Sequence, residues 1–119
     1  MKPVQPEDRI IQNIHTADFQ PFDPDDQGSS RESVLQLGDK QRLGVGFHVY
    51  KMAPDTWTTP HEHTDHEEFL LLSGDLRDND GTEYQIGDLV WMRKGTQHSS
   101  YSEKGCVLAV YIATPEKEV

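Results

Sequence analysis

Short segments in which apolar and polar residues alternate follow one another along most of the chain. In one of them, Val45, Phe47 and Val49 alternate with His48 and Tyr50, which marks the two faces of a strand. Glycine, aspartate and asparagine separate such segments at short intervals, and one Asn-Asp-Gly sequence is a hairpin-turn signal. No stretch has the spacing of a long amphipathic helix. This pattern predicts an all-β protein, either a sandwich or a barrel.

Three of the predicted strands are apolar on both faces rather than on one: residues 69–72, 89–92 and 106–112. An antiparallel strand with one face in water should alternate, so we expect something to cover these strands. The candidates are the segment 1–31, as an N-terminal arm and loop packing on the barrel, and a second subunit in a homodimer. Residues 113–119 resemble a polar tail. We expect residues 1–119 to form a single domain.

The balance of charge excludes several classes of partner. The chain has 21 acidic and 11 basic residues, a net charge of −10, and no window that concentrates lysine or arginine. Binding to nucleic acid or to an anionic membrane is therefore not expected. Neither a secretory signal nor a stretch able to span a bilayer is visible, which leads us to expect a cytoplasmic protein.

Two features have ordinary structural explanations. Cys106 is the only cysteine, so no internal disulfide can form, and its apolar surroundings indicate a small core residue. Asp23, Asp25 and Asp26 form an acidic cluster without the spacing of an EF-hand, and we interpret it as part of a solvated loop.

The segment PHEHTDHEEFLLLSG, residues 60–74, carries the candidate chemistry. His61 and His63 are two residues apart, so in an extended chain both imidazoles point to one side. Glu67 follows on the next predicted strand, and two imidazoles with a carboxylate are typical of a divalent-metal site. A zinc-protease helix is excluded because the residue four after His61 is Asp65. The alternative is a cluster of solvated histidines at a loop tip.

Three neighbouring side chains are alternative candidates for this site. Glu68 points away from Glu67 on the same strand, and His66 belongs to a turn, which places it at the rim. His48 could enter the pocket or form a hydrogen bond on its strand face, and the sequence leaves both open. No residue stands out as a general base, so no catalytic residue is assigned.

A second segment, GDLVWMRKGTQHSSYS, completes a resemblance to a known family. The two segments together resemble the paired motifs of a single-domain cupin, a double-stranded β-helix barrel of the jelly-roll kind. The residues that match these motifs are His61, His63, Glu67, Gly74, Gly87, Gly95 and His98. The chain departs from the pattern at Asp55, Arg93 and Ser102, where glycine, proline and asparagine are usual. These departures affect turn geometry and leave the ligands intact.

The resemblance implies that one divalent metal is bound by His61, His63, Glu67 and His98. Four ligands on an octahedral ion leave two positions open for water, oxygen or a chelating small molecule. We expect Fe²⁺ or Zn²⁺, with Ni²⁺ and Mn²⁺ as alternatives, because the ligand types alone do not choose among these ions. No organic cofactor is expected.

A narrower resemblance is to the ChrR-like cupins. The shared cues are Glu-Glu after the histidines, Ser-Gly followed by aspartate, and Glu-Lys-Gly-Cys near the end. That group includes dioxygenases that cleave acetylacetone and dihydroxyacetophenone, and the cupin half of certain zinc-binding anti-sigma factors. The resemblance implies a metal-dependent dioxygenase acting on a small diketone or aromatic ketone. The alternative is a non-catalytic metal-binding module that senses a ligand or docks on a partner; we favour the enzyme because nothing in the chain matches the helical domain of the anti-sigma factors.

Overall fold

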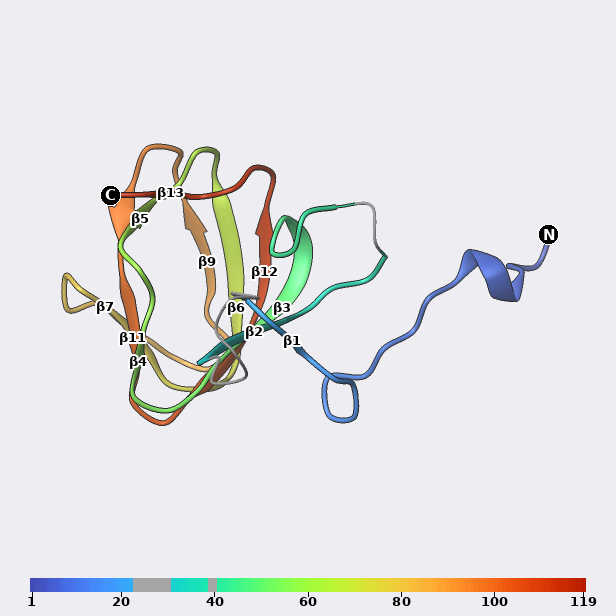
Figure 1. The fold of residues 1–119 in the computed structure, drawn as a ribbon, viewed down its shortest axis with the longest axis horizontal. Helices are drawn as coiled ribbons and strands as arrows, with labels where there is room; N and C mark the ends of the chain where they lie inside the picture. The colour runs from blue at the N-terminus through green and yellow to red at the C-terminus, as the bar shows by residue number, and fades with distance from the viewer. Residues whose placement is uncertain (23–30, 39–40) are drawn as a thin grey trace.

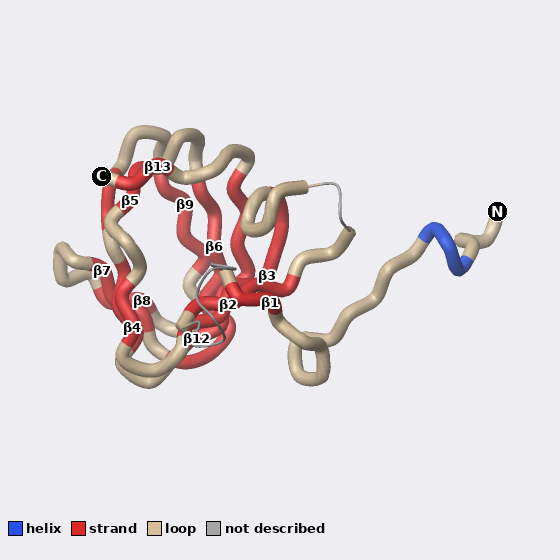
Figure 2. The backbone as a smooth tube through the Cα atoms, in the orientation of Figure 1, coloured by secondary structure: helices blue, strands red, loops and turns tan. Residues whose placement is uncertain are grey.

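The computed structural model describes residues 1–22, 31–38 and 41–119, and within these ranges almost all regular structure is β-strand (Figure 2). One 3₁₀ turn, η1 (Pro6–Asp8), precedes the strands. The strands are β1 (Gln20–Pro21), β2 (Glu32–Leu35), β3 (Gly46–Met52), β4 (Thr56–Trp57), β5 (His61–Glu62), β6 (Glu67–Gly74), β7 (Leu76–Asp78), β8 (Glu83–Tyr84), β9 (Leu89–Met92), β10 (Gln97–His98), β11 (Ser100–Ser102), β12 (Cys106–Ile112) and β13 (Lys117–Glu118). The predicted all-β class is confirmed. The acidic cluster Asp23, Asp25 and Asp26 lies outside the described residues.

The strands form three antiparallel sheets arranged as a jelly-roll barrel (Figure 1). A six-stranded sheet in the order β1-β2-β3-β12-β6-β9 makes one wall, and a four-stranded sheet in the order β4-β11-β7-β8 lies opposite to it. The small third sheet, β10-β5-β13, has β5 at its centre. No helix in the described ranges is long and apolar enough to cross a membrane.

Alternate side chains of the six-stranded sheet fill the interior of the barrel. The buried apolar cluster consists of Met52, Phe69, Leu71, Leu76, Cys106, Leu108, Val110 and Ile112. On β3, His48 is buried, whereas Phe47 is 69% exposed. The alternation in the sequence therefore marks this strand correctly, but its apolar face lies outside, because polar groups occupy part of the interior. Cys106 is buried in the core, as predicted.

The outer face of the same sheet is largely apolar across β3, β12, β6 and β9. The strand register places Phe47 opposite Tyr111, Tyr111 opposite Glu68, and Glu68 opposite Trp91. The neighbouring row across the same strands is Val49, Ala109, Leu70 and Leu89. Leu89 is 78% exposed and Trp91 is 53% exposed. These two rows, which we call the outer sheet face, are thus only partly covered by the described chain.

The N-terminal arm, residues 1–19, extends away from the barrel (Figure 1). Val4, Ile10 and Ile11 on this arm are all exposed to solvent. The arm leads into β1, which pairs with β2 at the edge of the six-stranded sheet. The arm therefore reaches the barrel through backbone hydrogen bonds of a two-residue strand.

Gly74 ends β6 at a point where two backbone segments meet. Its φ is +84°, and a Cβ atom placed there would lie 1.9 Å from the carbonyl oxygen of Gly105 and 2.7 Å from Cα of Cys106. Both obstructing atoms belong to the backbone, so neither can move aside easily. Only glycine fits this contact, which packs the end of β6 against the start of β12.

Candidate metal centre

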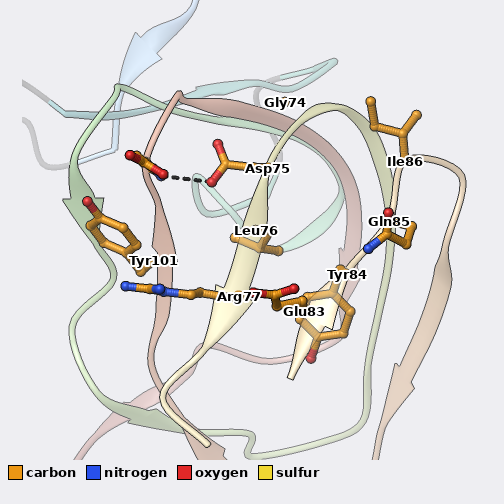
Figure 3. Close-up of a pocket in the computed structure, with 10 residues that line it drawn as sticks. Gly74, Asp75, Leu76, Arg77, Glu83, Tyr84, Gln85, Ile86 and Tyr101 are labelled. Carbon is orange, nitrogen blue, oxygen red and sulfur yellow. Dashed lines mark hydrogen bonds between the residues drawn. The ribbon is translucent and has the colours of Figure 1, made fainter. Parts of the chain in front are cut away.

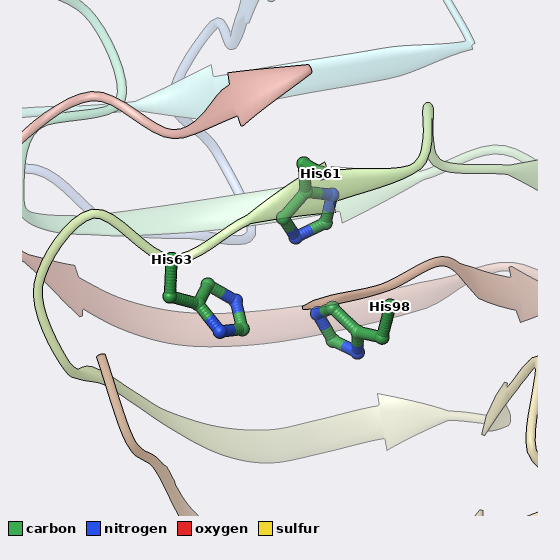
Figure 4. A group of neighbouring side chains, drawn as sticks. All are labelled: His61, His63 and His98. Atoms are coloured by element: carbon green, nitrogen blue, oxygen red, sulfur yellow. The ribbon is translucent and has the colours of Figure 1, made fainter. Parts of the chain in front are cut away.

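Three histidines converge on one space inside the barrel (Figure 4). His61 lies on β5, His63 follows that strand, and His98 lies on β10. Antiparallel pairing of β5 with β10 puts His61 directly opposite His98. The ring centroids are separated by 4.7 Å for His61 and His98, 4.8 Å for His63 and His98, and 5.2 Å for His61 and His63. The structure therefore brings the three sequence-predicted imidazoles together.

Hydrogen bonds fix the orientation of the first two rings. Nδ1 of His61 lies 2.8 Å from the carbonyl oxygen of Thr59, so this nitrogen carries the proton and donates it. Nδ1 of His63 lies 2.9 Å from Oγ1 of Thr96, and that hydroxyl donates its own proton to the carbonyl oxygen of Arg93 at 2.7 Å. The hydroxyl must therefore accept from His63. Both rings, when neutral, keep their Nε2 lone pairs for another partner.

His98 is oriented by a buried carboxylate. Its Nδ1 donates to Oδ2 of Asp78 at 3.0 Å. The hydroxyls of Tyr84 and Ser100 each donate to the same carboxylate at 2.6 Å. Burial raises the pKa of Asp78, but the hydrogen bonds from His98, Ser100 and Tyr84 outweigh it and hold the pKa below its usual value. An ionised carboxylate behind an imidazole is the arrangement found behind metal-binding histidines.

Two of the histidine nitrogens have no hydrogen-bond partner within the described ranges. These are Nε2 of His63 and Nε2 of His98, and both atoms are buried. A buried polar atom without a partner costs about 1–3 kcal/mol, so folded proteins rarely leave one unexplained. A metal ion bound between the rings would accept both lone pairs. The donor set therefore fits a divalent metal, and Nε2 is the atom of each ring that would bind it.

The predicted carboxylate lies beside these imidazoles. Glu67 is only 7% exposed, and its Oε2 lies 3.6 Å from Nε2 of His63. Burial, together with the charge of Glu116 and a hydrogen bond to it, raises the pKa of Glu67 well above the usual value. A cation in the site would offset this effect and favour the ionised carboxylate.

A second carboxylate reaches the site from the C-terminal segment, which the sequence suggested to be a polar tail. Oε1 of Glu116 lies 3.5 Å from Nε2 of His61. The segment is held on the barrel, because β13, which begins directly after Glu116, pairs with β5. No spacing rule relates this residue to the histidines, so the sequence offered no signal for it. The outer hydrogen-bond partners Asp78 and Thr96 were missed for the same reason.

The ligand atoms fall into two overlapping groups in which all members lie within 4.8 Å of one another. One group holds His61, His63 and His98, and the other holds His61, His63, Glu67 and Glu116. Bonds of roughly 2.0 to 2.2 Å from an ion to nitrogen or oxygen give separations of this order between ligands. Burial, reinforced by His98 and His61, lowers the pKa of His63 to about 4, so this ring is neutral and competent to bind metal at physiological pH.

The rival residues lie outside both groups. Glu68 is exposed on the outer sheet face, opposite Trp91. The ring of His66 stacks 6.0 Å from Trp91, on the outside of the barrel. His48 is buried, and its Nδ1 lies 3.0 Å from the carbonyl oxygen of Gly46. Of its two expected roles, the structure shows the hydrogen bond, and burial lowers the pKa of the ring.

A hollow of about 440 Å³ lies on the four-stranded sheet (Figure 3), and none of the three histidines lines it. Arg77 and Tyr101 line it, with the guanidinium 4.8 Å from the centre of the phenol ring. Tyr84 also lines this hollow, and its hydroxyl reaches Asp78. The hollow is therefore linked to the site only through Tyr84, and none of the candidate ligands lines it.

Two opposed antiparallel sheets with an inward-facing group of histidines define a cupin. The chain matches the ChrR cupin-like domain family over residues 7–114 and therefore belongs to that family. The family membership agrees with the resemblance inferred from the two motifs. No curated protein sequence matches the chain.

Solved structures support the fold. An acetylacetone dioxygenase from Acinetobacter johnsonii is 12% identical, with a TM-score of 0.72 over 100% of this chain and 82% of that chain. An RmlC-like cupin protein from Ralstonia eutropha JMP134 is 19% identical, with a TM-score of 0.69 over 87% of this chain and 68% of that one. A chain of the complex of SigE with the anti-sigma factor ChrR from Rhodobacter sphaeroides is 14% identical, with a TM-score of 0.62; the match covers 82% of this chain and about half, 49%, of that one. Likeness at these identities shows the fold alone.

Proposed function

We propose that this cupin binds one divalent metal ion through His61, His63, Glu67 and His98, and that the loaded protein is a dioxygenase for a small diketone or aromatic ketone. One observation carries the metal site: three imidazoles with engaged Nδ1 atoms point their Nε2 atoms into one space, where two of those atoms are buried and have no hydrogen-bond partner among the described residues. The fold shared with an acetylacetone dioxygenase supports the choice of reaction. Fe²⁺ and Zn²⁺ are the proposed ions, with Ni²⁺ or Mn²⁺ as alternatives.

In this reaction, the residues of the chain would bind the metal ion and hold its ligands in the right orientation. When bound, an iron ion supplies redox and Lewis-acid chemistry with open coordination positions. Thr96 and Asp78 hold two of the rings so that Nε2 faces the ion, and the burial of Glu67 keeps water away from the carboxylate. The burial of His61, His63 and Glu67 keeps bulk water from the site, which strengthens the interaction between the carboxylate and the cation.

Thermal melting tests the metal site. After chelator treatment, a metal at one hundred times its dissociation constant should stabilise the fold by about 2.7 kcal/mol, which for a domain of this size raises Tm by on the order of 10 °C. Glu67→Ala and His98→Ala should lose most of this shift. Glu68→Ala, the matched control with an outward carboxylate, should keep it. Equal shifts in wild type and His98→Ala would place the ion elsewhere.

Oxygen uptake tests the reaction. The iron-loaded protein is incubated with a panel of β-diketones and aromatic ketones while dissolved oxygen is recorded. Uptake should depend on one class of ketone and should be lost in His98→Ala. If no ketone raises uptake above the His98→Ala control although the metal is bound, the protein is not this dioxygenase.

A non-catalytic metal-binding module is the second candidate. The fold shared with a chain of the SigE–ChrR complex supports it, and so does the presence of two carboxylates at the site, which would occupy positions that a substrate needs. The two candidates differ in whether a small chelating anion can bind the metal. A metal-loaded protein that binds no such anion, and shows no oxygen uptake, favours the module.

We also propose that the protein is a homodimer, assembled through the outer sheet face. The exposure of Leu89 and Trp91 on that face supports this proposal, because a two-fold contact is the commonest way to bury such a surface. Cytoplasmic location stays a prediction from the sequence.

A further inference from the structure

The C-terminal segment is fastened across the strand that carries His61. β13 pairs with β5, so that Glu118 lies opposite His61. The backbone N–H of Val119 donates to the carbonyl oxygen of Pro60 at 3.2 Å. The segment is therefore joined by backbone hydrogen bonds to residues on the histidine strand and directly before it.

A second set of contacts holds the beginning of the segment. The hydroxyl of Thr64 donates to the carbonyl oxygen of Pro115 at 2.7 Å and lies 2.5 Å from the hydroxyl of Thr114. Thr64 directly follows His63 in the chain, so both histidines have C-terminal residues fastened beside them. Glu116 lies between the two sets of contacts, which leaves its backbone little freedom.

The position of the Glu116 carboxylate suits a ligand. Its Oε1 is 3.5 Å from Nε2 of His61, and its ligand atom lies within 4.8 Å of those of His61, His63 and Glu67. Glu116 itself is exposed, whereas His61, His63 and Glu67 are buried, so its carboxylate would reach the ion from the solvent side of the site.

Charge gives an independent reason for a second carboxylate. Neutral imidazoles add no charge, so Glu67 is the only one of the four predicted ligands that brings a negative charge to the ion itself; the carboxylate of Asp78 lies behind His98. A buried net charge is costly unless it is paired. With Glu116 included, the ligands themselves carry two negative charges against the two positive charges of the ion.

We propose that Glu116 is a fifth protein ligand of the metal and that residues 113–119 form a strap across the site, which the bound ion holds more firmly in place. This inference rests on the proposed metal site but not on the proposed reaction. Three imidazoles and two carboxylates leave one open position on an octahedral ion, instead of the two expected from the sequence. Binding of the ion and ordering of the strap should then be coupled.

The test compares Glu116→Gln with Glu118→Gln, which makes the same charge change on the same segment outside both ligand groups. Affinity for Zn²⁺ is measured by competition with a chromophoric chelator, and the visible absorption of Co²⁺ reports the coordination of the ion. We expect Glu116→Gln to weaken Zn²⁺ binding at least about 10-fold, since even partners behind the ligands contribute that much, and to change the Co²⁺ spectrum. Glu118→Gln should resemble wild type in both measurements.

Amide hydrogen exchange of the strap gives a readout that does not depend on affinity. Saturating Zn²⁺ should slow exchange at Val119, whose N–H is bonded to Pro60, in wild type and Glu118→Gln. It should have little effect in Glu116→Gln at the same occupancy. If Glu116→Gln were poorly folded, as judged by circular dichroism, Glu116→Asp should still lower Zn²⁺ affinity, because it shortens the side chain by one carbon.

Two outcomes separate failure of the strap from failure of the site. Wild-type affinity, spectrum and exchange in Glu116→Gln, combined with loss of Zn²⁺ binding in His98→Ala, would overturn the strap and leave the metal site standing. Retention of Zn²⁺ binding in His63→Ala and His98→Ala would overturn the metal site itself, and the strap with it.

Discussion

At the scale of single residues, each imidazole of the site faces a different kind of acceptor. Nδ1 of His61 faces a backbone carbonyl, Nδ1 of His63 faces a hydroxyl, and Nδ1 of His98 faces a carboxylate. A charged acceptor forms a stronger hydrogen bond than a neutral one and makes the opposite nitrogen a better donor to a metal. His98 should therefore be the most firmly oriented of the three rings.

Asp78→Asn is expected to weaken metal binding without removing any ligand. The amide has the size of the carboxylate but lacks its charge, and His98, Ser100 and Tyr84 all donate to this group. We expect Zn²⁺ affinity to fall about 10- to 100-fold in a chelator competition. Asp80→Asn, in the turn after the same strand, should keep wild-type affinity. Indistinguishable affinities for the two variants would contradict the role given to Asp78.

His63 should make the metal-free protein less stable in mild acid. Burial and the neighbouring imidazoles lower its pKa from 6.5 to about 4 in the folded protein. Between these values the unfolded chain binds a proton that the folded chain does not. The free energy of unfolding should fall as pH falls, by at most about 1.4 kcal/mol per pH unit, and this loss should end below about pH 4.

Glu67 has the opposite effect on acid stability, and a variant can separate the two. Its raised pKa means that the folded chain holds a proton that the unfolded chain releases, so acidification through this range stabilises the fold. Urea unfolding with chelator present should therefore show a steeper acid loss in Glu67→Gln than in wild type. Adding His63→Gln should reduce that slope. An unchanged slope in the double variant would assign the acid loss to other groups.

At the scale of elements, what the sequence could predict depends on how far apart the partners lie along the chain. The geometry of one strand puts His61 and His63 on one side, so their spacing is a usable signal. Asp78 meets His98 only because β7 pairs with β11, and Glu116 meets His61 only because β13 pairs with β5. The alternation of residues within one strand does not show which distant strand it pairs with. For this reason the sequence of residues 113–119 resembles that of a polar tail.

Gly74→Ala is expected to be more destabilising than Gly87→Ala. Both glycines have positive φ, 84° and 93°, so each alanine carries a backbone cost of roughly 1–2 kcal/mol. Gly87 has nothing within 4 Å of an added Cβ, whereas Gly74 has three backbone atoms under 3.0 Å. Urea unfolding should show a loss of more than about 3 kcal/mol for Gly74→Ala alone. Similar losses of unfolding free energy in the two variants would show that the backbone near Gly105 can move aside without destabilising the fold.

At the scale of the whole molecule, the barrel has a polar interior at the site and an apolar exterior on one wall. The sequence showed which strands are apolar on both faces, and this predicts the exposed outer sheet face. It did not show which face of β3 lies inside, because periodicity marks two faces without saying which one the barrel encloses. His48 lies inside on this strand and Phe47 outside. On this strand, a buried polar side chain and an exposed apolar one reverse the usual rule that the apolar face is buried.

Leu89→Asp should break the proposed homodimer. Leu89 is 78% exposed on the outer sheet face, so a charge there would not disturb the core but would be costly inside an interface. Light scattering at micromolar concentration should give twice the monomer mass of 13.6 kDa for wild type and the monomer mass for the variant. Ile86→Asp, at a position 64% exposed and off this face, is the control and should stay dimeric. A wild-type protein with the monomer mass would refute the dimer.

The two ends of the described chain differ in their surroundings. Met1 lies at the far end of the N-terminal arm, whereas Val119 is bonded to Pro60, directly before His61 (Figure 1). A polypeptide joined before Met1 would start far from the barrel. One joined after Val119 would start beside the proposed metal ligands, and a histidine tag placed there could compete with them for the ion. Fusions and affinity tags therefore belong at the N-terminal end.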